Sequence, residues 1–109
     1  MDEPQALVPL DAAGVPLKVA TPEVDISVNR ARDLLAQSDV SGARNALAIA
    51  AAARSPEALF AMAETYDPNV LAALGTRGVL ADPGRSRELY IAAGLLGHAM
   101  ADGRLAALR

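Results

Sequence analysis

Very few side chains in this sequence have the types and the spacing that catalysis or metal binding requires. The chain contains one histidine, His98, which has no partners at the spacing of metal ligands, and no cysteine, which excludes thiolate chemistry. Asp67 and Asp82 each stand before a proline, where the capping of a helix already accounts for them. The segment GTRGVLADPG, which begins at Gly75, lacks the lysine and hydroxyl pattern of a phosphate-binding loop. We therefore expect no enzyme, no cofactor and no metal site.

The residues best suited to contact a partner are three arginines, Arg77, Arg85 and Arg87. One interpretation is that they are solvated and form weak surface pairs with Asp82 or Glu88. The other is that they bind a carboxylate of a protein partner, since arginine is enriched at energetically important positions of interfaces. The sequence leaves both interpretations open.

Three further residues complete the predicted contact set: Tyr66, Asn69 and Tyr90. The two tyrosines also fit the apolar faces of predicted helices, which makes them core candidates. A buried tyrosine hydroxyl needs a hydrogen-bond partner or a position at the edge of the core.

Four dipeptides of an oxygen-bearing residue followed by proline predict where helices begin. Proline suits the first helical position, and the residue before it suits the N-cap, whose side-chain oxygen accepts a free backbone N–H. The four predicted caps are Thr21, Ser55, Asp67 and Asp82. The resulting helices span about 22–37, 40–53, 56–66, 68–75, 83–96 and 98–108.

Other residues predict how these helices end and which faces are apolar. Asp39 caps the second helix, Gly97 closes the fifth, and Gly75 and Gly78 bracket a turn. Apolar residues recur at helical spacing in three segments. They are Val24, Val28, Ala31, Leu34 and Leu35 in the first helix, Leu59, Met62, Ala63 and Tyr66 in the third, and Leu89, Tyr90, Ala93 and Leu96 in the fifth. No alternation typical of a sheet is present.

Residues 1–20 differ from the rest, because three prolines and two VPL motifs oppose a helix. We interpret them as an extended arm or linker. A disordered tail, a segment that docks its apolar residues into a groove of this or another copy, and a hairpin turning at 11–14 remain open. If the arm docks, deletion of residues 1–20 changes the oligomeric state or the thermal stability.

The chain resembles itself at an offset of 43 residues. ARNALAIAAAARSPEA, from Ala43, aligns with SRELYIAAGLLGHAMA, from Ser86. Because the chain is rich in alanine, the other matches carry the argument: Asp39 with Asp82, Arg44 with Arg87, Leu47 with Tyr90 and Met62 with Leu105. Such a period indicates a stack of helical repeats.

The segment 58–101 resembles a Sel-one-like repeat, a relative of the tetratricopeptide repeat. The matching residues are Ala58, Met62, Ala63 and Tyr66, then Gly78, Val79 and Asp82, then Ser86, Leu89, Tyr90, Ala93, Gly94, Gly97, His98 and Ala101. Segment 43–58 resembles the second helix of a preceding repeat. Ala63 and Leu89 depart from the usual glycine and tryptophan, and DPNVLAALGT, from Asp67, is longer than the usual turn. The resemblance implies a structural role for His98.

The predicted fold is therefore all-α, a right-handed solenoid of antiparallel helix hairpins with five to six helices and an extended N-terminal arm. Repeat one spans about 22–55, repeat two about 56–97 and a terminal helix about 98–108, within a helical-repeat domain of 21–109. The resemblance implies a protein-interaction module that acts as a scaffold or adaptor. The alternatives are a homodimer formed through Met100, Leu105 and Leu108 of the last helix, and a recognition domain of a larger secretion or envelope protein.

Composition limits the partners and the compartment only broadly. The chain has 109 residues, a net charge of −3 and a pI of about 5.0, which argues against a nucleic-acid binder. No apolar run is long enough to span a bilayer. The abundance of alanine, arginine and glycine is compatible with a high-GC bacterium, so we expect a soluble domain in a bacterial cytoplasm or a periplasmic part of a longer chain.

Overall fold

The computed structural model describes residues 22–76 and 78–108, and this part of the chain is helical, without a strand. The predicted arm, the cap Thr21 and the candidate contact residue Arg77 lie outside the described residues. The six helices are α1 (Pro22–Ala36), α2 (Val40–Ala52), α3 (Pro56–Glu64), α4 (Pro68–Leu74), α5 (Pro83–Leu95) and α6 (Ala101–Ala107). The all-α prediction is confirmed.

Side-chain caps start four of these helices, as the sequence predicts. Asp39 accepts the N–H of Gly42 at α2, and Ser55 accepts that of Ala58 at α3. The other two caps are Asp67, which accepts from Asn69, and Asp82, which accepts from Arg85. Each cap satisfies one of the backbone donors that the first turn leaves without a partner.

The ends of four helices are closed by a residue in the left-handed region: Ser38, Arg54, Gly75 and Gly97. At the end of α5, Gly97 donates to the Gly94 carbonyl and His98 donates to the Ala93 carbonyl, the pair of bonds that defines a Schellman motif. Only glycine adopts this backbone without steric cost, so the prediction that Gly97 closes this helix is confirmed.

The same turn corrects the predicted start of the last helix. The sequence predicts a start at 98, but α6 begins at Ala101, because Gly97 and His98 still belong to the turn that closes α5. The His98 ring accepts the Met100 N–H through Nδ1, 3.2 Å away, which holds the connection as a turn. The other helices begin at the predicted residues and end one or two residues earlier than predicted.

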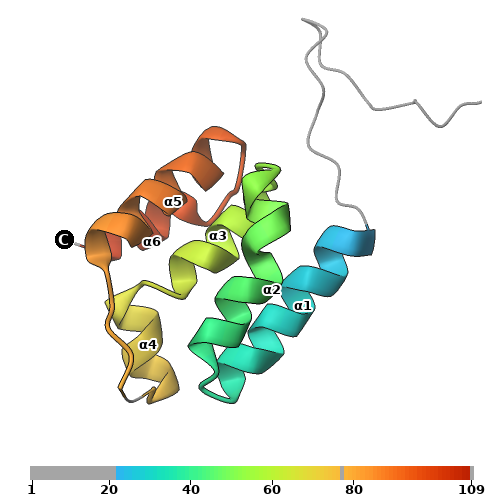
Figure 1. Ribbon diagram of the computed structural model, residues 1–109. Helices are drawn as coiled ribbons and strands as arrows, with labels where there is room; N and C mark the ends of the chain where they lie inside the picture. Colours follow the sequence, from blue (N-terminus) through green and yellow to red (C-terminus); the bar gives the residue numbers. More distant parts are fainter. Residues whose placement is uncertain (1–21, 77, 109) are drawn as a thin grey trace, which may run out of the picture.

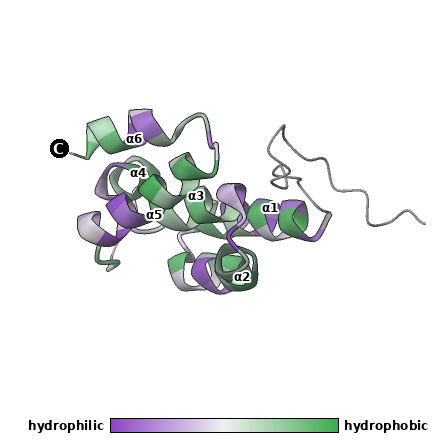
Figure 2. Cartoon of the chain, turned by 90° about the horizontal axis from the view of Figure 1, so that it is seen from above, coloured by the Kyte–Doolittle hydropathy of each residue, from purple (hydrophilic) through white to green (hydrophobic). Residues whose placement is uncertain are grey.

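Helix α3 lies at the centre of the helix packing. Helix α1 packs against α2, α3 contacts both of them and also α5, and α5 packs against α6 (Figure 1). Seen from above, the largely hydrophobic α3 lies between α1 and α2 on one side and α5 and α6 on the other (Figure 2). Because α3 has neighbours on several sides, it buries more than the single face that the sequence predicts, and Phe60 and Ala61 are buried as well.

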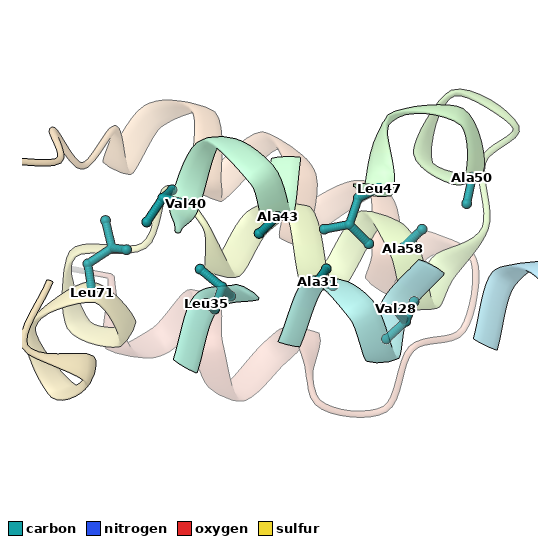
Figure 3. Packing of buried hydrophobic residues seen from close by; sticks show 10 residues of the cluster. Val28, Ala31, Leu35, Val40, Ala43, Leu47, Ala50, Ala58 and Leu71 are labelled. Carbon is teal, nitrogen blue, oxygen red and sulfur yellow. The ribbon is translucent and has the colours of Figure 1, made fainter. Parts of the chain in front are cut away.

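The core consists of two clusters joined at α3. In the first, Ala31 and Leu35 of α1 lie opposite Ala43 and Leu47 of α2, and Val28 of α1 belongs to the same cluster (Figure 3). The second cluster joins α3 to α5 and α6, with these buried members: Leu59, Phe60, Ala63, Leu89, Tyr90, Ala93 and Leu108. Alanine at the crossings lets the helix axes approach closely.

The 43-residue offset recurs in the structure. Helices α2 and α5 both have 13 residues, and their bounds differ by 43 positions at each end. Leu47 and Tyr90, which correspond at this offset, are both 0% exposed. Arg44 donates to the carbonyl of Thr65, and Arg87, 43 positions later, donates to the carbonyl of Leu108, again 43 positions later. The two segments therefore share helix length, buried positions and one interhelical hydrogen bond.

Candidate protein-interaction surface

Tyr66 follows the end of α3 and lies beneath an arginine of another helix. The guanidinium of Arg44 in α2 stands over its ring, 3.9 Å from the ring centroid. Arg44 also donates through Nε to the Thr65 hydroxyl at 3.2 Å and through Nη2 to the Thr65 carbonyl at 2.7 Å. Two hydrogen bonds and a cation–π contact thus fix this guanidinium at the end of α3.

Arg85, from the first turn of α5, approaches the same ring. Its guanidinium carbon lies 5.8 Å from the Tyr66 centroid, and its Nη1 lies 3.9 Å from a carboxyl oxygen of Glu88. Both partners of that pair are exposed, so the pair contributes little to stability. The Tyr66 carbonyl accepts the N–H of Asp82, which places the start of α5 beside the end of α3. Tyr66 and Arg85, two of the predicted contact residues, therefore meet at one place.

Two other predicted contact residues lie elsewhere and bind the C-terminal end of α6. Asn69 of α4 donates through Nδ2 to the Ala107 carbonyl at 3.0 Å, and Arg87 of α5 donates to the Leu108 carbonyl at 3.4 Å. Lysine, arginine and amide groups at such carbonyls satisfy acceptors that the last helical turn leaves without a partner. Both side chains are partly occupied in holding α6.

The prediction that Tyr90 contacts a partner is wrong, because Tyr90 is 0% exposed and offers no surface to another molecule. Its hydroxyl donates to Oδ2 of Asp67 at 2.7 Å and accepts from Nη1 of Arg104 at 3.1 Å. Arg104 also pairs with Glu64 at 2.9 Å. The polar network formed by Glu64, Asp67, Tyr90 and Arg104 joins α3, the start of α4, α5 and α6 in the interior.

Burial and the hydrogen bond to Asp67 raise the pKa of the Tyr90 hydroxyl well above its ordinary value, although Arg104 opposes this shift. Burial lowers the pKa of the Arg104 guanidinium, but its hydrogen bonds with Tyr90 and Glu64 outweigh burial and raise it overall. Both shifts preserve the forms in which the network is bonded, a neutral phenol and a charged guanidinium. We interpret this network as structural, because its hydrogen bonds join four elements of the fold; Glu64 also lines a hollow of about 220 Å³.

A groove of about 380 Å³ runs beside Arg44, between the start of α2 and the segment that leads to α5. Its lining comprises Ser38, Asp39, Val40, Ser41, Arg44, Gly78, Val79 and Leu80. Val79 is half-buried, while Leu80 is 88% exposed and forms an apolar rim. Arg44 was not among the contact residues predicted from the sequence. Its partners lie 21 residues away, and helical periodicity carries no signal for such a contact.

His98 is half-buried, and its ring stacks on Phe60 with 4.0 Å between centroids and 3° between planes. Among residues 22–76 and 78–108, no group of three or more histidine, aspartate or glutamate side chains is arranged to hold a metal ion. No helix in the described part of the chain has the length and hydrophobicity needed to cross a membrane.

Comparison with protein-family models, with curated proteins and with solved structures gives no match to this chain. The resemblance to Sel-one-like repeats therefore stays a prediction that depends on the residues quoted above.

Proposed function

We propose that this chain is a protein-interaction module built from tetratricopeptide-like helix hairpins in a right-handed stack. In this proposal, α1 and α2 form the first hairpin, α3 and α5 form the second, and α6 covers the end. Stacks of this kind present extended surfaces to peptides and protein partners. The proposal assigns no catalytic step to the chain.

One observation carries the proposal: corresponding arginines hold corresponding helix ends at an offset of 43 residues. Arg44 binds the carbonyl of Thr65, and Arg87 binds the carbonyl of Leu108. A chance similarity between alanine-rich segments explains two helices of equal length. It does not explain why, in both segments, an arginine donates a hydrogen bond to the carbonyl 21 residues later. A repeated unit of helix, partner helix and arginine clamp explains both.

The surface around Tyr66 is the part of this module that we assign to partner binding. Arg44 and Arg85 place two cations within 6 Å of one aromatic ring. Tyrosine and arginine are the residue types that most often dominate interface energetics. Val79 and Leu80, which follow the insertion that contains α4, form one wall of the groove beside Arg44.

Selection of random displayed peptides on the folded chain tests the proposal. We expect related peptides that bind with micromolar dissociation constants, the range typical of small recognition modules. Substitution of Tyr66 by alanine should weaken their binding by roughly tenfold or more, the effect expected of an interface hot spot. Substitution of Arg30, which is exposed on α1, serves as the matched control and should leave binding unchanged. A selection that yields no peptide above background contradicts the proposal.

A second candidate, homodimerisation, is favoured by exposed apolar residues near the end of α5. Leu95 is 81% exposed and Met100 is 56% exposed. Of the residues predicted for the dimer face, Met100 is exposed, whereas Leu108 is buried and Leu105 packs against the second core cluster. Light scattering at micromolar concentration decides this candidate: a dimer mass that Leu95→Glu abolishes supports it, and a monomer mass rejects it.

A further inference from the structure

Arg44 combines partial burial with the absence of a counter-charge. Its Nε and Nη2 bind Thr65, and its guanidinium stacks on Tyr66. Within residues 22–76 and 78–108, no acceptor binds its Nη1 and no carboxylate forms an ion pair with it. A guanidinium has five N–H donors, so most of the capacity of this fixed group is unused inside the molecule.

The groove beside Arg44 supplies the other features of a binding site. Its lining includes the hydroxyl-bearing Ser41 on one wall and the apolar Val79 and Leu80 on the other. An exposed leucine next to a half-buried valine offers contact area for an apolar side chain. The site therefore pairs one oriented cation with one apolar wall.

The nearby acidic groups are already engaged. Asp39 also lines the groove, but one of its carboxyl oxygens accepts the N–H of Gly42 at 2.9 Å. Asp82 caps α5 in the same way, through the N–H of Arg85 at 3.0 Å. Each cap charge faces the positive end of a helix dipole, which offsets it. Arg44 lies at the negative end of α3, but no carboxylate of the described residues forms an ion pair with it.

We propose that this groove binds an acidic segment of a protein partner. An aspartate or glutamate side chain of the segment binds the unused edge of Arg44, and an apolar neighbour contacts Val79 and Leu80. This inference rests on the interaction function proposed above and names the class of peptide that the module recognises. Charge-assisted bonds from a pre-oriented guanidinium to a carboxylate are among the strongest that proteins form.

Partial burial of Arg44 favours an acidic side chain in the interior of the segment over a chain terminus. A side chain can reach down to the guanidinium while the peptide backbone stays in the open groove. The C-terminal carboxylate is attached directly to the backbone, so its approach requires the backbone itself to enter.

The test titrates the whole ¹⁵N-labelled protein with blocked acetyl-Ala-Leu-Glu-Leu-Ala-amide and with the same peptide carrying Gln in place of Glu. We expect the glutamate peptide to shift the amide signals of Ser41, Val79 and Leu80 and to bind roughly tenfold more tightly than the glutamine peptide, as one charge-assisted bond predicts. Its affinity should fall as salt rises. A third peptide, with glutamine and a free C-terminal carboxylate, should match the glutamine peptide.

Two variants complete the design. Arg44→Gln should reduce the preference for glutamate to near unity, while Arg30→Gln, on an exposed position of α1, should preserve it. If Arg44→Gln fails to fold, the comparison of glutamate and glutamine peptides on the wild type still decides the matter.

The other possible results of the titration and the selection each contradict one of the statements made above. Equal binding of the glutamate and glutamine peptides overturns the acidic-segment inference. If peptide selection nevertheless yields binders, the interaction function stands without it. Tight binding of only the free-acid peptide overturns the assignment to an interior side chain. No shift with any peptide, together with an empty selection, contradicts both proposals.

Discussion

Replacement of Tyr90 by phenylalanine removes one hydroxyl from the centre of the polar network and leaves the ring in place. The hydroxyl donates to Asp67 at 2.7 Å and accepts from Arg104 at 3.1 Å. Asp67 is 1% exposed, so water does not replace the lost donor freely. Hydrogen bonds to ionisable groups contribute about 1.5–3 kcal/mol, so we expect a loss of about 2 kcal/mol in the free energy of unfolding. Asp67 keeps the Asn69 N–H, which limits the loss.

Urea denaturation followed by circular dichroism measures this change, and Tyr66 provides the matched control. No described residue forms a hydrogen bond with the Tyr66 hydroxyl, and its contact with Arg44 uses the ring, which phenylalanine retains. Tyr66→Phe should therefore alter stability by less than about 0.5 kcal/mol. A Tyr90→Phe variant as stable as the wild type, or one no less stable than Tyr66→Phe, would refute the assignment of the network as a structural element.

Three further predictions follow from burial and backbone geometry. Because the pKa of Tyr90 is raised, the folded state retains the hydroxyl proton at a higher pH than the unfolded state does. The contribution of this hydroxyl to the free energy of unfolding is therefore complete below the ordinary pKa of about 10 and is lost as the pH rises above it. Urea melts should show the wild type losing about 1.4 kcal/mol per pH unit there relative to Tyr90→Phe, whereas parallel curves would contradict the shift. Ala93→Leu, at a position with 0% exposure, should destabilise by about 1–3 kcal/mol through overpacking, whereas Ala52→Leu on the exposed face of α2 should have little effect in the same melts. Thermal unfolding should show Gly97→Ala destabilised, because φ is +98° there, and Gly103→Ala stabilised by about 0.5–1 kcal/mol inside α6; the opposite order would contradict the backbone assignment.

Local signals in the sequence were sufficient for the helix starts. An N-cap oxygen binds an amide two or three residues later, so the geometry at Ser55, Asp67 and Asp82 depends on neighbours in the chain. The last helix shows the limit of this reasoning. The start at 98 was wrong because the turn that closes α5 includes Gly97 and His98, so the next helix begins three residues later.

Contacts between distant residues were less predictable. Leu96 was expected on the apolar face of its helix, but it lies at the C-cap and is 37% exposed. Asn69 is exposed, and its amide reaches the last turn of α6, 38 residues later, a contact that the sequence did not predict. Arg44 gave no signal as a site residue, since its environment is assembled from α2, the end of α3 and the segment before α5. Periodicity identifies which face of a helix is buried, but it does not specify which helix meets that face.

The stacking of two related hairpins is tested most directly by nuclear Overhauser effects between side chains in solution. We expect contacts of the Tyr90 ring with Phe60, whose ring centroid lies 5.2 Å away, and of the Leu47 methyls with Ala31 and Ala58 of the first cluster. The contacts of Leu47 with α1 and of Tyr90 with α3 place α2 and α5 in equivalent positions, each against the first helix of its own hairpin. A spectrum in which Leu47 and Tyr90 show only contacts within their own helices would contradict the repeated architecture and the function proposed from it.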